Sequence, residues 1–190
     1  MSASLVGSEM CIRDSFQEVV STVTALAEET VSAAVRVHSR KLAQRFGVPM
    51  GVSGAPQDLL VVGMGKLGGE ELNVSSDIDL VFVYDEGGET QAVGEFSSAR
   101  RQVTNHEFFD RLARRVIASI NEIDGTGFVF RVDMRLRPFG DSGPLVISSA
   151  MLEEYLYSEG RDWERFAWLK GRVVNRNVFA GEENFAQAVR

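Results

Sequence analysis

Residues 59–85, LLVVGMGKLGGEELNVSSDIDLVFVYD, contain two apolar runs separated by a glycine-rich turn. The first run ends at Gly63, and the second run, residues 78–84, begins among the aspartates Asp77 and Asp79. Short apolar runs bounded by glycine and polar residues are typical of buried β-strands. The stretch therefore predicts two core strands joined by a turn that carries the polar residues.

Both aspartates are expected to point toward the same side of the second strand. Side chains alternate along a strand, so Asp77 and Asp79 share one face with Val81 and Val83. The other face carries Ile78, Leu80, Phe82 and Tyr84. Two neighbouring carboxylates raise each other's pKa unless a cation lies between them, and a hard divalent ion such as Mg2+ would suit them. The alternative is that both acids end a solvated strand or cap a turn.

The glycine-rich turn just before these aspartates is a candidate phosphate cradle. Its backbone N–H groups can bind phosphate, and Lys66 adds a positive charge. The residues expected to form the cradle are Gly65, Lys66, Gly68, Gly69 and Ser76.

Three of the glycines also fit a dinucleotide-binding fingerprint, G-x-G-x-x-G, at Gly63, Gly65 and Gly68. That interpretation needs a crossover helix of roughly 10–12 residues or more, whereas only residues 69–76 are available. It also leaves the two aspartates unexplained in a strand that a parallel sheet would bury on both faces. A metal and phosphate site is therefore the favoured interpretation.

A third carboxylate lies in residues 128–138, FVFRVDMRLRP, which alternate strictly between apolar and charged positions. The charged face carries Arg131, Asp133, Arg135 and Arg137. One interpretation is an edge strand kept soluble by its charges. The other is an active-site wall in which Asp133 completes the metal site and the arginines bind phosphate oxygens.

Three stretches carry a resemblance to a known family: GMGKLGGEELNVSSDIDL (63–80), FRVDMRLRPFGDSGPLV (130–146) and GRDWERFAWLK (160–170). Together they resemble glutamine synthetase adenylyltransferase, a family of bifunctional adenylylating and adenylyl-removing enzymes within the polymerase β-like nucleotidyltransferases. The resemblance runs from about Ser15 to the end of the chain. Gly65-Lys66 stands where the superfamily usually has Gly-Ser, so Lys66 is expected to replace the serine contact.

The resemblance implies an α/β (α+β) fold of the polymerase β-like nucleotidyltransferase type, with a mixed sheet and flanking helices. It also implies that Asp77, Asp79 and Asp133 are catalytic and bind Mg2+. Lys66, Arg135 and Arg137 would then converge on the attacking phosphate.

The expected reaction is phosphorolytic removal of AMP from adenylylated glutamine synthetase with release of ADP, because RPFGDSGP (137–144) and GRDWER (160–165) resemble the N-terminal, adenylyl-removing half of the family. The alternatives are the adenylylating half, which transfers AMP from ATP to glutamine synthetase, and a non-catalytic nucleotide-sensing module. The implied partners are glutamine synthetase, ATP, ADP, AMP, phosphate and a PII-type signalling protein.

Composition limits the other function classes. The 190 residues are 44% hydrophobic and carry a net charge of −7, which argues against nucleic acid as the main partner. One cysteine excludes an internal disulfide framework. No apolar run reaches the roughly 18 residues of a membrane span and no secretory signal is recognisable, so a cytoplasmic enzyme is expected.

Four segments are expected along the chain. Residues 1–14 lack periodicity and are predicted to be a non-native or disordered tail. Ser15 and Glu18 form a capping-box pattern that predicts a long amphipathic helix over 15–47. The nucleotidyltransferase core would occupy 48–147, and a truncated helical extension would occupy 148–190.

Overall fold

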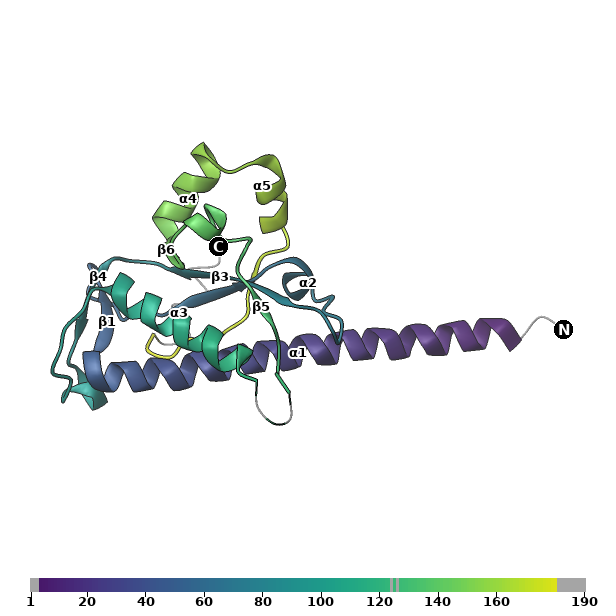
Figure 1. Ribbon diagram of the computed structural model, residues 1–190, viewed down its shortest axis with the longest axis horizontal. Helices are drawn as coiled ribbons and strands as arrows, with labels where there is room; N and C mark the ends of the chain where they lie inside the picture. Colours follow the sequence, from purple (N-terminus) through teal and green to yellow (C-terminus); the bar gives the residue numbers. More distant parts are fainter. Residues whose placement is uncertain (1–3, 124, 126, 181–190) are drawn as a thin grey trace.

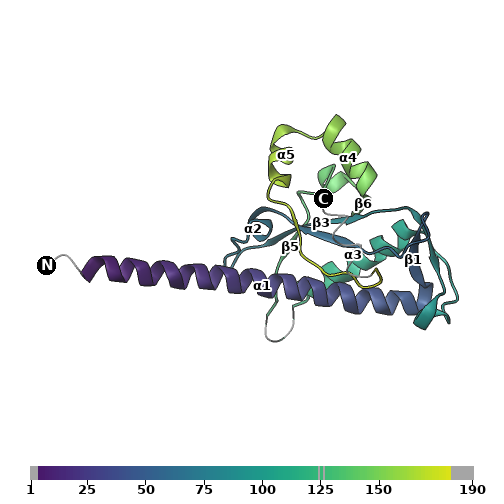
Figure 2. The same ribbon diagram turned by 180° about the vertical axis from the view of Figure 1, so that it is seen from behind.

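A computed structural model describes residues 4–123, 125 and 127–180, with side chains described from residue 16 onward. A β-sheet lies between two layers of helices (Figure 1). One layer consists of α1 (Ser4–Phe46) and α3 (Asn105–Asn121), and the other of α4 (Ser149–Ser158) and α5 (Asp162–Trp168). Figure 2 shows the same layers from behind. No helix among the described residues is long and apolar enough to cross a membrane.

The main sheet is mixed, as expected from the sequence. Its path is β5–β3–β2–β7, and β6 also pairs with β3. The strands are β2 (Leu60–Gly63), β3 (Ile78–Tyr84), β5 (Val132–Asp133), β6 (Val146–Ser148) and β7 (Arg172–Val173). β2 runs antiparallel to β3, whereas β5 and β6 run parallel to it. The antiparallel pair excludes the dinucleotide-binding alternative, which needs two parallel strands around a crossover helix.

The predicted alternation of β3 is confirmed by its packing. Leu80 and Phe82 pack into the large core cluster with residues of α1 and α3. Val81 and Val83 pack on the opposite face, in a cluster that includes Leu152 of α4. The face that carries Val81 and Val83 is therefore the one covered by α4 and α5, and Asp79 belongs to it.

Helix α1 ends as predicted but begins earlier. It starts at Ser4, so Ser15 lies inside the helix and does not cap it. Residues 4–14 contain no proline, and each residue added to an existing helix gains one backbone hydrogen bond. Figure 1 shows the N-terminal part of α1 extending past the sheet. Among the apolar residues of α1, Phe16, Val19 and Leu26 are exposed, whereas Val20 and Ala27 are buried.

The segment after the first helix, for which the sequence predicts a loop over residues 48–58, instead begins with a strand. A second, two-stranded sheet pairs β1 (Val48–Gly51) with β4 (Gly88–Gln91). A short 3-10 helix, η1 (Gly94–Phe96), follows β4. Four-residue strands carry too little alternation to be recognised from sequence, and only Thr90 of β4 is fully buried.

The predicted strand over 128–138 is much shorter in the structure. Within residues 128–138, only Val132 and Asp133 of β5 pair with β3, and Phe128 is half exposed. The chain then turns, with Arg137 N donating to Met134 O at 3.3 Å, and Pro138 has no N–H for a sheet ladder. A further 3-10 turn, η2 (Gly140–Ser142), follows before β6.

Candidate functional site

The parallel pairing of β3 and β5 brings two of the predicted carboxylates together. Asp79 lies directly opposite Asp133 in the strand register, and Ile78 lies opposite Val132. The backbone of Asp79 is also held from the side of the glycine turn, because its carbonyl oxygen accepts a hydrogen bond from Met64 N at 2.9 Å. The acid pair therefore sits where the glycine turn meets the two strands.

The glycine turn forms one helical turn, α2 (Gly65–Gly68). Gly65 has φ +54°, and a Cβ there would lie 2.9 Å from Asp79 Oδ2. A side chain at this position would therefore be strained and would press on the carboxylate. Gly65 is the member of the predicted cradle that adjoins the acid pair.

The other glycines of the turn, Gly68 and Gly69, have structural roles. A Cβ on Gly68 would lie 2.1 Å from the carbonyl oxygen of Lys170. The N–H groups of Gly68 and Gly69 donate to Met64 O and Gly65 O, each at 3.1 Å. These two glycines close the turn and allow the segment after α5 to approach it.

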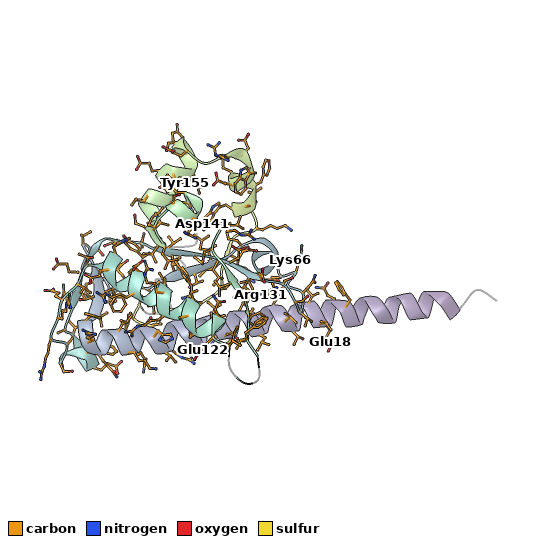
Figure 3. The ribbon with its side chains drawn as sticks, viewed as in Figure 1. Glu18, Lys66, Glu122, Arg131, Asp141 and Tyr155 are labelled. Atoms are coloured by element: carbon orange, nitrogen blue, oxygen red, sulfur yellow. The ribbon has the colours of Figure 1, made fainter. Side chains whose placement is uncertain are left out.

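Lys66 is exposed and lies at the same edge of the sheet. Its Nζ donates to Ser76 Oγ at 3.1 Å, so the two polar members of the predicted cradle contact each other across the connection to β3. Figure 3 labels Lys66 on α2 and Arg131 near β5. Lys66 is also close enough to Asp79 for its charge to lower the pKa of that carboxyl.

Asp77 is paired with Arg131, which sequence reasoning placed on the charged face of residues 128–138 but did not pair with an aspartate. Arg131 Nε donates to Asp77 Oδ1 at 2.6 Å, and the guanidinium lies 5.8 Å from the centre of the Phe128 ring. A signal for this contact exists in the sequence. Aligning residues 77–79, DID, in parallel with residues 131–133, RVD, places an arginine against the first aspartate.

Asp133 is held by Arg135, two residues further along the chain. Arg135 Nε lies 2.7 Å from Asp133 Oδ2, and Arg135 N donates to Oδ1 at 2.9 Å. The Asp133 side chain is 13% exposed, whereas that of Arg135 is 78% exposed. The carboxylate is thus embedded, while its partner reaches it from solvent.

Arg137 lies beside the acids but is engaged with its own loop. Its Nη1 donates to Met134 O at 2.8 Å, and its Nη2 lies 3.4 Å from Asp141 Oδ1. The side chain is only 13% exposed, and Nε is buried with no hydrogen-bond partner among the described residues. Arg137 therefore joins the loop of residues 137–144 to the edge of the site.

The two paired acids differ in their electrostatics. Burial raises the pKa of Asp79, and the charges of Asp133 and Asp77 raise it further, against the opposing charges of Arg135 and Lys66. The hydrogen bond from Arg135 holds the pKa of Asp133 below its usual value. Asp79 is therefore the carboxylate of the site whose negative charge is least compensated.

These donors match Mg2+ in chemistry, since a hard divalent ion prefers oxygen ligands. Their arrangement does not yet match a three-carboxylate site. Within the part of the chain that the structure describes, no three His, Cys, Asp or Glu side chains are grouped as metal ligands. In the structure Arg131 is paired with Asp77 and Arg135 with Asp133.

An open apolar groove of about 660 Å3 lies on the same sheet face as Asp79. The sheet contributes Val62 and Val83, and the helical layer contributes Leu152 and Trp168. Val83 is four residues beyond Asp79, which corresponds to roughly 13 Å along the strand. The groove thus begins within the length of a nucleotide from the acid pair.

The stretches of residues 137–144 and 160–165 meet at Tyr155 of α4. Its ring lies 4.5 Å from that of Phe139, in the loop of residues 137–144. Its hydroxyl donates to Glu164 Oε1 of α5 at 2.7 Å. Tyr155 therefore packs both stretches into one unit beside the site, a role that sequence reasoning missed.

Comparisons with known proteins agree with this architecture. The glutamate-ammonia ligase adenylyltransferase family matches residues 3–187, a range that also includes residues before Ser15. A protein of Burkholderia mallei is 54% identical over 170 residues, covering 90% of this chain and 18% of the relative. One of Chromobacterium violaceum is 52% identical over 174 residues, covering 91% and 18%.

A third relative, from Nitrosomonas eutropha, is 51% identical over 166 residues, covering 86% of this chain and 17% of the relative. All three are named bifunctional glutamine synthetase adenylyltransferase/adenylyl-removing enzyme. The chain thus spans less than a fifth of the length of these relatives. With a family match over nearly all of its residues, the chain belongs to the glutamate-ammonia ligase adenylyltransferase family.

Proposed function

We propose that this region is a nucleotidyltransferase domain that removes AMP from adenylylated glutamine synthetase by phosphorolysis. The observation that carries the proposal is the pairing of Asp79 with Asp133 beside Gly65, in a chain that belongs to an adenylyltransferase family. Asp77, one residue before β3, adds a third carboxylate whose charge acts on Asp79. Such a concentration of acids is suited to phosphoryl chemistry rather than to fold stability.

The chemistry is a displacement at one phosphorus atom. A phosphate oxygen bonds to the α-phosphorus of the adenylyl-tyrosine, the bond from that phosphorus to the tyrosine oxygen breaks, and the tyrosine oxygen takes a proton. The products are ADP and unmodified glutamine synthetase. Transfer of AMP from ATP to the tyrosine, with release of pyrophosphate, is also a displacement at an α-phosphorus. The same aspartates therefore suit either reaction, and the binding of free phosphate distinguishes the removing half.

Cations around the acid pair support a role for free phosphate. Lys66 and Arg135 both act on Asp79, and Arg135 and Arg137 both act on Asp133. Lys66 and Arg135 are exposed and can reach a ligand, whereas Arg137 shapes the loop beside them. Guanidinium groups bind phosphate through two parallel hydrogen bonds, so Arg135 is the first candidate for the attacking phosphate.

The remaining parts of the substrate are assigned by chemistry. The adenosine moiety would extend from the acid pair toward the apolar groove, where Trp168 and Leu152 offer an apolar surface for the base. Mg2+ is the proposed cofactor, with Asp77, Asp79 and Asp133 as its proposed ligands, and it would neutralise charge on the phosphates. Glutamine synthetase and a PII-type regulator are the proposed protein partners.

The test uses the full-length protein that carries this region, because its relatives combine both activities in one chain. The variant Asp79→Asn should lower the release of ADP from adenylylated glutamine synthetase, in the presence of phosphate and Mg2+, by about a thousandfold or more. Transfer of AMP from ATP to unmodified glutamine synthetase should continue. Far-UV circular dichroism should be unchanged, since Asp79 contributes charge rather than packing.

A matched control is Asp110→Asn, which removes a carboxylate from the outer face of α3, where it pairs with Arg114. That variant should retain both activities. Loss of AMP transfer in Asp79→Asn, with ADP release intact, would assign the region to the adenylylating half. Retention of both activities would refute a catalytic role for this domain and favour nucleotide sensing.

A further inference from the structure

Arg135 is placed to serve two anions in turn. In the structure it satisfies Asp133, yet the proposed reaction needs the same guanidinium for phosphate and the same carboxylate free of it. We propose that Arg135 is an exchangeable counter-ion: it leaves Asp133 when a divalent cation binds the carboxylates, and it then binds the phosphate. The inference rests on the proposed function and predicts that cation and phosphate bind cooperatively.

The contact itself is local and two-pronged. Arg135 Nε approaches both oxygens of Asp133, at 2.7 and 3.1 Å, and the backbone N–H of the same residue adds a third bond at 2.9 Å. The carboxylate is therefore saturated by a single residue two positions away. Moving the Arg135 side chain alone would reopen the carboxylate, while the backbone bond could stay.

The exposures indicate which partner moves. The Arg135 side chain is 78% exposed, whereas the Asp133 side chain is 13% exposed on a paired strand. An ion pair with one partner in solvent is held weakly, because water and salt screen the attraction and the long side chain gains freedom on release. Arg135 can thus swing away while Asp133 stays in position.

The charge balance of the site explains why the exchange needs a cation. Asp79 and Asp133 are opposite each other on neighbouring strands, and Asp77 is two residues from Asp79. Without Arg135, their repulsion would be compensated by Lys66, by the more distant charge of Arg137, and by Arg131, which is paired with Asp77. A divalent cation would replace the charge of Arg135 and make its bond to Asp133 unnecessary.

Arg137 provides a matched comparison within the same stretch. It also lies near Asp133 and carries the same charge, but its guanidinium is buried against Met134 O and is paired with Asp141. It does not bond to Asp133, so its removal changes the local charge without opening the carboxylate. Comparing variants of Arg135 and Arg137 therefore distinguishes exchange at Asp133 from the mere loss of a nearby positive charge.

The test measures cation affinity directly, using Mn2+ followed by electron paramagnetic resonance with and without inorganic phosphate. Arg135→Gln should bind Mn2+ about two- to fivefold more tightly than the wild type when phosphate is absent, because the competing guanidinium is gone. In the wild type phosphate should increase Mn2+ affinity, and in Arg135→Gln most of that increase should be lost. Thermodynamic linkage requires Mn2+ to strengthen phosphate binding by the same factor.

Two further variants complete the design. Arg137→Gln should change Mn2+ affinity by less than about twofold and keep the phosphate effect, as expected for a bystander charge. Arg135→Lys keeps the positive charge but loses the forked guanidinium, so its Mn2+ affinity should lie between those of the wild type and Arg135→Gln. Unchanged or weaker Mn2+ binding in Arg135→Gln would overturn the exchange.

Failure of the exchange and failure of the proposed function give different results. If Asp133→Asn abolishes Mn2+ binding while Arg135→Gln leaves it unchanged, the site stands and the exchange falls. If Asp79→Asn retains ADP release, the proposed function falls whatever Arg135 does. If the wild type binds no Mn2+, both the cation site and the exchange are refuted.

Discussion

The two ends of β3 show how one strand divides between holding the fold and carrying the site. At its C-terminal end, Phe82 and Val83 are flanked by β2 and β6 and buried on both faces. At its N-terminal end the parallel neighbour among the described residues is the two-residue β5, which sets Asp79 opposite Asp133 beside the apolar pair of Ile78 and Val132. The apolar end is satisfied by packing, whereas the acidic end depends on arginines that reach it from solvent.

This difference between the two ends of β3 shows where the fold tolerates a carboxylate whose charge is not compensated. Burial and the charge of Asp133 raise the pKa of Asp79, while the rest of the strand is anchored by contacts that do not involve this carboxyl. Helices α1 and α3 cover one face of that anchor, and α4 with α5 covers the other (Figure 1). The site therefore gathers carboxylates that repel one another, and the apolar packing of the rest of β3 holds them in place.

The largest predicted effect is at the apolar end. Phe82→Ala should lower the free energy of unfolding by roughly 3–5 kcal/mol, because it removes a fully buried ring from a core with little room to collapse. At the acidic end, Asp77→Ala breaks only an exposed pair with Arg131 and should cost about 1 kcal/mol or less. Urea denaturation monitored by circular dichroism measures both, and equal losses would contradict the division.

A smaller effect is expected where a polar residue supports the apolar end. Asn175 is buried, its Oδ1 accepts from Val61 N at 2.7 Å, and its Nδ2 donates to Leu59 O at 2.8 Å, so it extends the edge of β2 beyond β7. Asn175→Ala should cost about 1–3 kcal/mol by leaving buried backbone groups unpaired. The exposed Asn73→Ala should stay within about 0.5 kcal/mol in the same titration. A similar loss of unfolding free energy in both variants would show that the buried hydrogen bonds of Asn175 contribute no more than an exposed side chain does.

Much of the fold followed from patterns within short stretches. The apolar runs around Gly63 and the alternation of β3 predicted the central strands and their faces, because burial imposes those periods directly. The short strands β1 and β4 were missed, since four residues offer too few repeats. The length of β5 was overestimated because the alternation of apolar and charged residues continues through a turn that begins at Met134. No residue typical of turns occurs between Met134 and Pro138.

The proximity of the candidate site residues could be anticipated from the sequence, whereas their pairings could not. Gly65, Asp79 and Asp133 lie together although they come from separate segments, and their catalytic roles stay a prediction. The bond between Arg131 and Asp77 depends on strand register, which is a tertiary property and is invisible within either segment alone. The turn that buries Arg137 likewise forms only when the loop of residues 137–144 folds back on the site.

The smallest predicted effect has opposite signs at the two paired acids. The folded pKa of Asp79 is raised, so the folded state binds more protons than the unfolded state above the unfolded pKa of about 3.9, and stability falls as pH rises through that window. Asp133 has a lowered folded pKa, so its contribution is present above the unfolded pKa and is lost as pH falls through the folded one. In divalent-free buffer at pH 7, Asp79→Asn should therefore raise the melting temperature, by about 1–2 °C after solvent screening, and Asp133→Asn should lower it. The gain in Asp79→Asn should disappear below about pH 4, where the wild-type carboxyl is protonated in both states. Differential scanning calorimetry from pH 3.5 to 8 measures both shifts, and a change of the same sign in the two variants would mean that their charges are not divided between Arg135 and the strand as the structure has them.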